Sequence, residues 1–219
     1  MNKKVVVIAL VLVLAVGSVF AAKKSADIKV GAQLGYGGRS VTLSGKDTFK
    51  GNSYKLTNGG FYGAFTFEMG LTEDLSLKAE AGINTMGKEQ TSLKLKKIDP
   101  IKGEYSESTP VNFSLFAGAM YNLELSKELT MSFGAGVDMM MGKLSSDEDA
   151  KSNTAIGLGA EAGVAYAIND QISITCGAKF GWHFINTNDD IEDVKAKIGD
   201  DVSSSLVSYK FLAGVTYAL

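Results

Sequence analysis

The sequence has little of what several functional classes require. It contains one Cys, so a disulfide framework and a Cys-based zinc site are both excluded. It has only two Pro, and no apolar run after residue 21 approaches the length of a membrane-spanning helix. The formal net charge of −2 argues against a nucleic-acid binder, which would carry a basic surface. With 219 residues, of which 45% are hydrophobic, the chain is long enough for one sizeable domain.

The first residues have the order of a secretory signal peptide. A short cationic start precedes an aliphatic run from Val5 to Val16, and small residues then lead to Ala21. The run is too short to span a membrane, which takes about 20 apolar residues. We therefore predict a cleaved signal peptide over residues 1–21 and a mature domain over residues 22–219.

Eight segments with period-two alternation follow the predicted signal peptide. In each segment one set of alternate residues is hydrophobic at nearly every position, while the other set is rich in Gly and carries the charges. Short turns alternate with long connections, which cover about residues 38–59, 85–110, 141–153 and 185–205. The predicted strands are 27–37, 60–71, 75–84, 111–125, 129–140, 154–168, 172–184 and 206–219.

The polar face decides the class of barrel. A soluble barrel turns its apolar face inward, whereas an outer-membrane barrel turns it toward lipid. A face dominated by Gly suits a narrow interior better than a solvated exterior. Aromatic residues also gather near both ends of the strands, as in the two girdles found at membrane interfaces. The loop-end set is Tyr36, Phe61, Phe113, Trp182 and Tyr209, and the turn-end set is Phe67, Tyr121, Tyr166 and Tyr217. The sequence therefore predicts an all-β protein, an eight-stranded up-and-down antiparallel transmembrane β-barrel.

The inward set of residues places charges in the predicted lumen. Counting outward from the first and third short turns sets Glu68 opposite Lys78 and Glu161 opposite Lys179. We predict a cross-strand ion pair at each position. The other inward charges are Lys29, Glu80, Glu124, Asp138 and Lys210. Such a network could form a gate or a narrow ion path, but a hydrated plug is the commoner state of a barrel this small.

Few residues carry recognisable chemistry. His183 is the only histidine, and alternation points it inward, where Ser208 could lie near it. A hydrolase or acyltransferase would need such a pair together with an acid, but no motif links these residues. We expect no enzyme activity, no cofactor and no bound metal. Cys176 falls on the lipid face as a small apolar residue. The last long connection is acidic, and the spacing of its apolar residues predicts a short helix over 191–198.

The alternation, the connection lengths and the girdles together resemble the eight-stranded outer-membrane β-barrel superfamily of OmpA-type and OmpX-type proteins. The most specific segment is the last one, in which Gly214, Tyr217 and Leu219 match the signal read by the barrel-insertion machinery. It departs from that signal at Leu212, where a polar residue is usual, and in ending with Leu rather than Phe. The resemblance implies a location in the cell outer membrane, with outer-membrane lipid and the insertion machinery as partners.

The resemblance also implies a function. We expect a non-enzymatic role in envelope structure and surface interaction, adhesion-like, in which long loops contact an extracellular ligand or a host surface. The alternative is a narrow porin-like channel for small solutes. A lipid-modifying enzyme is a third possibility, and nucleic acid is not expected as a partner.

Overall fold

Period-two alternation produces strands along the whole described chain. The computed structural model describes residues 27–45, 53–85, 87, 89–95, 98–105, 111–143, 152–185 and 202–219. The predicted signal peptide and the predicted helix over 191–198 lie outside these residues. The strands are β1 (Ile28–Gly45), β2 (Ser53–Gly70), β3 (Leu75–Thr85), β4 (Glu89–Leu95), β5 (Ile98–Tyr105), β6 (Val111–Glu124), β7 (Leu129–Lys143), β8 (Ser152–Ala167), β9 (Ile172–Ile185) and β10 (Val202–Ala218). Among the described residues, no helix is long and apolar enough to cross a membrane.

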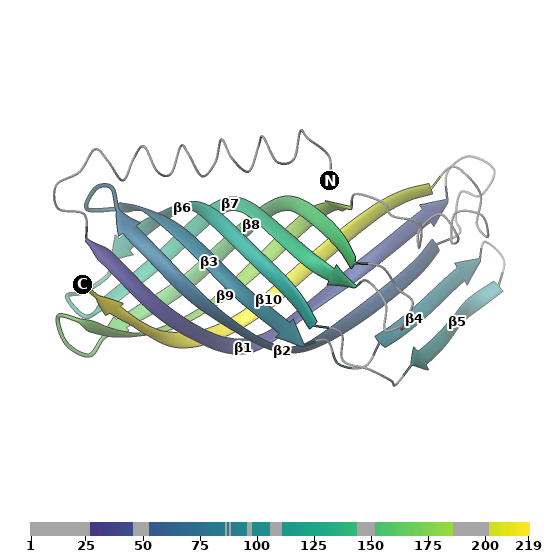
Figure 1. Ribbon diagram of the computed structural model, residues 1–219, viewed down its shortest axis with the longest axis horizontal. Coiled ribbons are helices and arrows are strands. Elements are labelled where there is room, and N and C mark those ends of the chain that lie inside the picture. The colour runs from purple at the N-terminus through teal and green to yellow at the C-terminus, as the bar shows by residue number, and fades with distance from the viewer. Residues whose placement is uncertain are drawn as a thin grey trace.

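The first strand closes the sheet into a barrel, because β1 pairs with β2 on one side and with β10 on the other. The order around the wall is β1-β2-β3-β6-β7-β8-β9-β10, and all neighbouring pairs are antiparallel. Figure 1 shows these strands inclined to the long axis of the barrel. Closure leaves no unpaired edge in the wall, as β-structure in hydrocarbon requires. The structure thus confirms the predicted eight-stranded antiparallel barrel.

Tight turns connect the strands at one end of the barrel, which we call the turn end. They cover residues 71–74, 125–128 and 168–171. The third is held by Asn169, whose Oδ1 accepts two backbone N–H groups of the same turn at 2.9 and 2.8 Å. The two ends of the described chain also meet here, since the N–H of Leu219 donates to the carbonyl of Ile28 at 2.9 Å. The opposite end, which carries the long connections, is the loop end.

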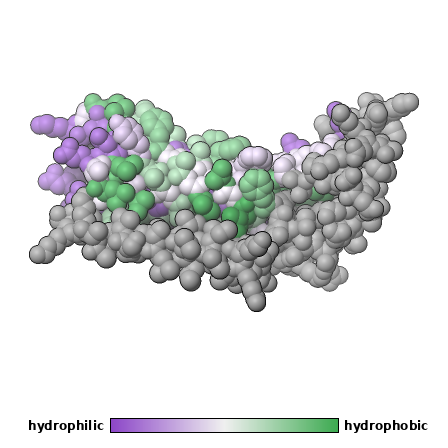
Figure 2. Space-filling view, turned by 90° about the horizontal axis from the view of Figure 1, so that it is seen from above, coloured by the Kyte–Doolittle hydropathy of each residue, from purple (hydrophilic) through white to green (hydrophobic). Residues whose placement is uncertain are grey.

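The outer surface of the barrel is apolar. Phe65 is 77% exposed and Leu158 is 62% exposed, whereas Tyr62 and Asp138, on the inward set, are fully buried. Figure 2 shows apolar residues across the middle of the visible face, with hydrophilic residues gathered at the turn end. A continuous band of exposed large apolar side chains is typical of a membrane surface. The alternation therefore faces lipid with its apolar set, as predicted.

The barrel is longer at the loop end than the sequence predicted. The stretch 38–59 was expected to be a loop, but β1 continues to Gly45 and β2 begins at Ser53, and the two pair up to the Ser44–Ser53 position. From Ser40 onward the alternation of β1 continues with its polarity reversed, so that inward Val41 and Leu43 are apolar and outward Thr42 and Ser44 are polar. The predicted strands 27–37 and 60–71 are too short because the prediction required an apolar outer face along the whole of each strand.

The predicted long loop over 85–110 contains a hairpin. Its strands β4 and β5 pair with each other, and β4 also pairs with the first residues of β2, from Ser53–Lys94 to Thr57–Gln90. Figure 1 shows the hairpin projecting at the loop end, beside the extended end of β2. The wall on this side of the barrel is therefore both taller and wider than eight simple strands would make it.

Candidate functional site in the barrel lumen

The centre of the lumen holds a buried cluster of lysines and carboxylates. Nζ of Lys179 lies 2.8 Å from Oε1 of Glu80 and 3.5 Å from Oε2 of Glu161. Lys78 contacts Glu161 directly, and its Nζ lies 4.0 Å from Oε2 of Glu80. All four side chains are at most 8% exposed. Removing one partner from such a cluster leaves a buried charge uncompensated, which typically costs about 3–5 kcal/mol.

The geometry of this cluster differs in part from the predicted pairs. Glu161 lies opposite Lys179 with its carboxylate within ion-pair distance, as the hairpin count predicts. Glu68 also lies opposite Lys78, but the predicted ion pair is not made. Glu68 Oε1 instead accepts hydrogen bonds from Ser76 Oγ at 2.5 Å and from an Asn122 side chain at 3.3 Å. The ammonium of Lys78 reaches across the lumen to Glu161, because a long inward side chain in a narrow barrel can meet the opposite wall.

A second group of buried polar residues lies beside the cluster. The hydroxyl of Tyr62 donates to Oε1 of Glu80 at 2.8 Å and lies 2.8 Å from Oγ of Ser114. Lys210 donates to the same Ser114 oxygen at 3.2 Å, and its Nζ lies 3.9 Å from Oδ1 of Asp138. The sequence analysis did not single out Tyr62 or Ser114. Their inward register beside predicted lumen charges is the signal that could have identified them.

Two aromatic rings complete this layer. Nζ of Lys179 lies 4.0 Å from the ring centre of Phe116, and Nζ of Lys210 lies 4.6 Å from that of Tyr62. Both distances are within the range of a cation–π interaction, which is strongest where water is excluded. The rings thus fill the space between the charged groups and help to close the barrel at mid-height.

Arg39 lies on the loop side of the charged cluster and is 1% exposed. Its Nε donates to Oδ1 of Asn58 and its guanidinium also donates to Oδ1 of Asn112, both at 3.1 Å. The sequence analysis placed residues 38–59 in a loop and therefore did not count Arg39 among the lumen charges. Arg39 therefore adds a layer of amide and guanidinium groups above the ion pairs.

An apolar layer closes the loop end of the lumen. Its side chains come from five strands, β1, β2, β7, β8 and β10. They are all at most 7% exposed, and Tyr54 packs against them. The buried members are Val41, Leu56, Met140, Ala155 and Leu206. This is the inside of the region in which the outer face turns polar, so the wall there has the arrangement of a water-soluble barrel.

The turn end of the lumen is open by comparison. A polar cavity of about 100 Å³ lies there, lined by residues that include Gln33, Glu68, Lys78 and Glu161. Its inner limit is thus the charged cluster. Lys29 and Glu124, which were predicted as lumen charges, are exposed near this rim. Their charges are solvated instead of paired in the interior.

The residues considered for catalysis are buried together. Nε2 of His183 lies 3.2 Å from Oδ2 of Asp138. The side chain of His183 is fully buried, and Ser208 is 1% exposed. A hydrolase triad needs its acid on one ring nitrogen of the histidine and an accessible serine on the other. Within the described part of the chain, no group of three or more His, Cys, Asp or Glu side chains is placed to hold a metal ion. The Asp138–His183 contact is part of the buried packing of the lumen.

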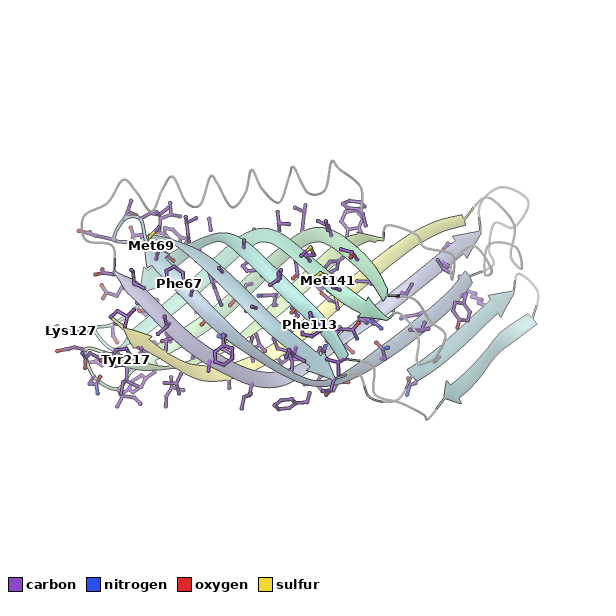
Figure 3. All side chains as sticks on the ribbon, viewed as in Figure 1. Phe67, Met69, Phe113, Lys127, Met141 and Tyr217 are labelled. Atoms are coloured by element: carbon purple, nitrogen blue, oxygen red, sulfur yellow. The ribbon has the colours of Figure 1, made fainter. Side chains whose placement is uncertain are left out.

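The predicted girdle residues lie on the outer face near both ends. Figure 3 shows Phe67 and Tyr217 toward the turn end and Phe113 toward the loop end. Tyr36 and Tyr209 have ring centres 6.4 Å apart on neighbouring strands. Phe67 and Tyr209 are half-buried. The side chains of the other girdle residues that have not yet been described are between 40% and 55% exposed. These are Phe61, Tyr121, Tyr166 and Trp182.

The residues of the predicted insertion signal lie at the end of the last strand, β10. Gly214 points into the lumen, where a Cβ would meet the carbonyl of Ala32 on β1. Tyr217 and Leu219 lie on the outer face at the turn end, and Leu219 is 76% exposed. The role of these residues in insertion stays a prediction. Cys176 is a free, exposed cysteine on the outer face, in keeping with its predicted lipid-facing position.

A closed antiparallel barrel with an apolar outer band and a polar interior defines an outer-membrane β-barrel protein. The chain matches the outer membrane protein beta-barrel domain family over residues 8–211, and it belongs to that family. Membership places the protein in the outer membrane and confirms the resemblance noted in the sequence.

Solved structures of two bacterial proteins show the same fold. The crystal structure of neisserial surface protein A is similar with a TM-score of 0.55 at 16% sequence identity, covering 90% of this chain and 100% of that chain. The crystal structure of the outer membrane protein OprG from Pseudomonas aeruginosa gives a TM-score of 0.52 at 11% identity, covering 87% and 95%. At such identities the similarity concerns the fold alone. No curated protein matches the chain.

Proposed function

We propose that this protein is a non-enzymatic barrel that supports the outer membrane and presents its loop end for surface interaction, with a lumen that does not conduct. The observation that carries the proposal is the double closure of the lumen. A buried charged cluster fills mid-height around Glu80 and Lys179, and an apolar layer around Leu56 and Leu206 fills the loop end. An aqueous path through the lumen would have to pass both layers of buried side chains.

The orientation of the barrel supports a role at the loop end. Outer-membrane barrels place short turns in the periplasm and long connections outside the cell. The turn end would then face the periplasm, and the extended strands β1, β2 and β10 would carry the connections and the β4–β5 hairpin outward. Long connections on a rigid scaffold are where binding specificity usually lies. The partner would be an extracellular ligand or a host surface.

A narrow channel is the second candidate, and the turn-end cavity is the observation in its favour. The cavity gives water access from one side as far as Lys78 and Glu161. Conduction would require both closures to open, since the apolar layer blocks the lumen beyond the charged cluster.

Conductance of the refolded full-length mature chain in planar bilayers tests the proposal. We expect silent bilayers from protein that shows the heat-modifiable migration of a folded barrel. Discrete conductance steps from such protein would contradict the proposal and favour the channel.

Surface interaction is tested separately with cells that display the barrel on a layer of cultured epithelial cells. Removing the β4–β5 hairpin and shortening the connection at 186–201 should lower retention of the displaying cells, while the barrel stays folded. Equal retention of both kinds of cell would contradict a binding role for the loop end. The enzyme alternative predicts altered lipid A or phospholipid in cells with the wild-type chain but not with His183→Ala, and we expect no such difference.

A further inference from the structure

The turn-end cavity has two unlike walls. On β8 the lining residues that point inward are small, namely Gly163, Ala165 and Ala167. On β2, which lies on the opposite side of the barrel in the strand order, the lining includes the longer polar side chains of Thr66 and Glu68. The small residues leave a space of about 100 Å³, and the polar residues across the lumen face it. The chemistry of the cavity is therefore set by its polar side.

Glu68 brings a carboxylate into this cavity and is held there by neutral groups. Its Oε1 accepts the hydrogen bonds from Ser76 and Asn122 described above. The amide of Asn122 is fixed in turn, because the Oγ of Ser132 donates to its Oδ1 at 2.7 Å and its Nδ2 donates to the Oγ of Ser76 at 3.0 Å. The position of the carboxylate is thus determined before any ligand binds, which lowers the entropy cost of binding.

No cation among the described residues is paired with Glu68. Lys29 and Lys78 are its register neighbours on β1 and β3, but the structure gives no ion pair between either lysine and this carboxylate. The lining holds two lysines and three glutamates, and Lys78 is already in contact with Glu161. Lys29 and Glu128 are both exposed at the rim and are of opposite sign. The cavity therefore has one negative charge in excess, and this charge lies at Glu68.

Two further acceptors are buried in the same lining. The Oε1 of Gln33 and the Oγ1 of Thr175 are buried, and neither has a hydrogen-bond partner within the described residues. Gln33 on β1 and Thr175 on β9 are both in register with Gly214 of β10, so they stand on either side of a position without a side chain. A buried acceptor without a donor typically costs about 1–3 kcal/mol. A ligand that donates hydrogen bonds to these oxygens recovers this cost.

The donors of a primary ammonium group match this lining. Such a group is positively charged at neutral pH, has three N–H donors and has no acceptor. It can pair with Glu68 and donate to the oxygens of Gln33 or Thr175. An anion would be repelled by the excess negative charge. A divalent cation would need several carboxylate ligands, and the described residues contain no group of three or more side chains placed to hold a metal ion.

We propose that the turn-end cavity binds the terminal ammonium group of a small aliphatic amine. Glu68 supplies the charged partner, and Gln33 and Thr175 supply neutral acceptors in the same lining. The amine enters from the turn end, which faces the periplasm in the orientation of outer-membrane barrels. This site is at the opposite end of the lumen from the surface interaction proposed above and does not rest on it, so its failure would leave that proposal unchanged.

Methionine NMR tests the proposal, because one methionine lines the cavity and another lies far from it. Met120 belongs to the lining and is 2% exposed, whereas Met140 belongs to the apolar layer at the loop end. The refolded full-length mature chain, with carbon-13 in its methionine methyl groups, is titrated in detergent micelles with putrescine. The methyl resonance of Met120, assigned with Met120→Leu, should shift to saturation, while that of Met140 should stay in place.

Variants of the lining identify the residues that bind. Glu68→Gln removes the charge but keeps an oxygen that can accept from Ser76 and Asn122, so it should fold and bind putrescine about tenfold more weakly. The matched control is Glu73→Gln, an exposed carboxylate of the first turn outside the lining, which should bind as the wild type does. Thr175→Val removes an acceptor and should weaken binding about threefold. Heat-modifiable migration checks the folding of each variant.

Two other solutes identify the chemistry that is recognised. The neutral diol of the same chain length should leave Met120 unmoved, and potassium chloride at the same concentration of positive charge should not displace putrescine. A shift with the diol, or displacement by potassium, would overturn the assignment to an ammonium group. Equal affinity of the wild type and Glu68→Gln, or no shift of Met120 in the wild type, would overturn the site itself.

Discussion

Asp138 and His183 meet across a strand that lies between them. Asp138 is on β7 and His183 on β9, and both are in register with Gly157 of β8. Nε2 of His183 lies 3.2 Å from Oδ2 of Asp138 over this bare position. A Cβ at Gly157 would run into the backbone of Trp182 and His183. The close approach of β9 to β8 therefore excludes a side chain at Gly157, and the two buried polar side chains meet over this position.

The first prediction concerns that glycine. Gly157→Ala should destabilise the barrel by about 1–3 kcal/mol, the usual cost of overpacking a well-packed interior. Urea unfolding in lipid bilayers, followed by tryptophan fluorescence, measures the change. Gly63→Ala is the matched control, because Gly63 lies on the outer face, where a Cβ would make only ordinary contacts of 3.4 Å and beyond. Similar stabilities for both variants would contradict the role assigned to Gly157.

The second prediction concerns the buried carboxylate. Asp138→Ala leaves the ammonium of Lys210 and the ring of His183 without this partner, and should lower the free energy of unfolding by about 3–5 kcal/mol. Asp170→Ala at an exposed turn should change it by less than about 0.5 kcal/mol. The same unfolding experiment compares the two. A small effect at Asp138 would show that water compensates these groups inside the barrel.

The third prediction follows from the two closures in series. Glu161→Ala opens the charged cluster only, so bilayers containing this variant should remain silent. The double variant Glu161→Ala/Leu206→Gly also thins the apolar layer and should show discrete conductance steps. Conductance from Glu161→Ala alone would show that the apolar layer is not a barrier to ions.

The fourth prediction locates the membrane boundary on one strand. On a Cys176→Ala background, Thr42→Cys should react with a water-soluble maleimide in proteoliposomes, whereas Leu34→Cys should not. Both residues point outward on β1, but Leu34 is in the apolar band and Thr42 beyond the girdle. Unfolded protein, in which both cysteines react, serves as the control. Equal protection of the two positions would place the outward residues of β1 beyond the girdle inside the bilayer.

Alternation and turn spacing were enough to predict the closed barrel, its lipid-facing side and the register of its short hairpins. Glu161 and Lys179 face each other because a short turn fixes the count along both strands. Strand limits at the loop end could not be predicted in the same way. Val41 and Leu56 keep the period of two but reverse its polarity, since the wall there leaves the hydrocarbon and needs an apolar interior.

Contacts across the lumen could not be predicted from the sequence either. Alternation says that Lys78 points inward, but its partner Glu161 lies on a strand that is not its neighbour. Such a contact depends on the diameter of the barrel and on which side chains are long enough to cross it. Tyr62 was not predicted for the same reason. Alternation places its phenol inside the barrel, but its hydrogen bond to Glu80 is seen only in the folded structure.

The pairing of β1 with β10 sets a condition on how the chain can fold. The register runs from Lys29–Ala218 to Gly45–Val202, so the longest sequence separations in the barrel belong to one continuous seam. Contacts between the two extremes of a chain form slowly, because ordering the intervening segment must come first. Until the last strand arrives, β1 has an unsatisfied edge that hydrocarbon does not tolerate. Stable insertion is therefore expected to be all-or-none, and loss of the final strand should prevent it altogether instead of yielding a smaller barrel.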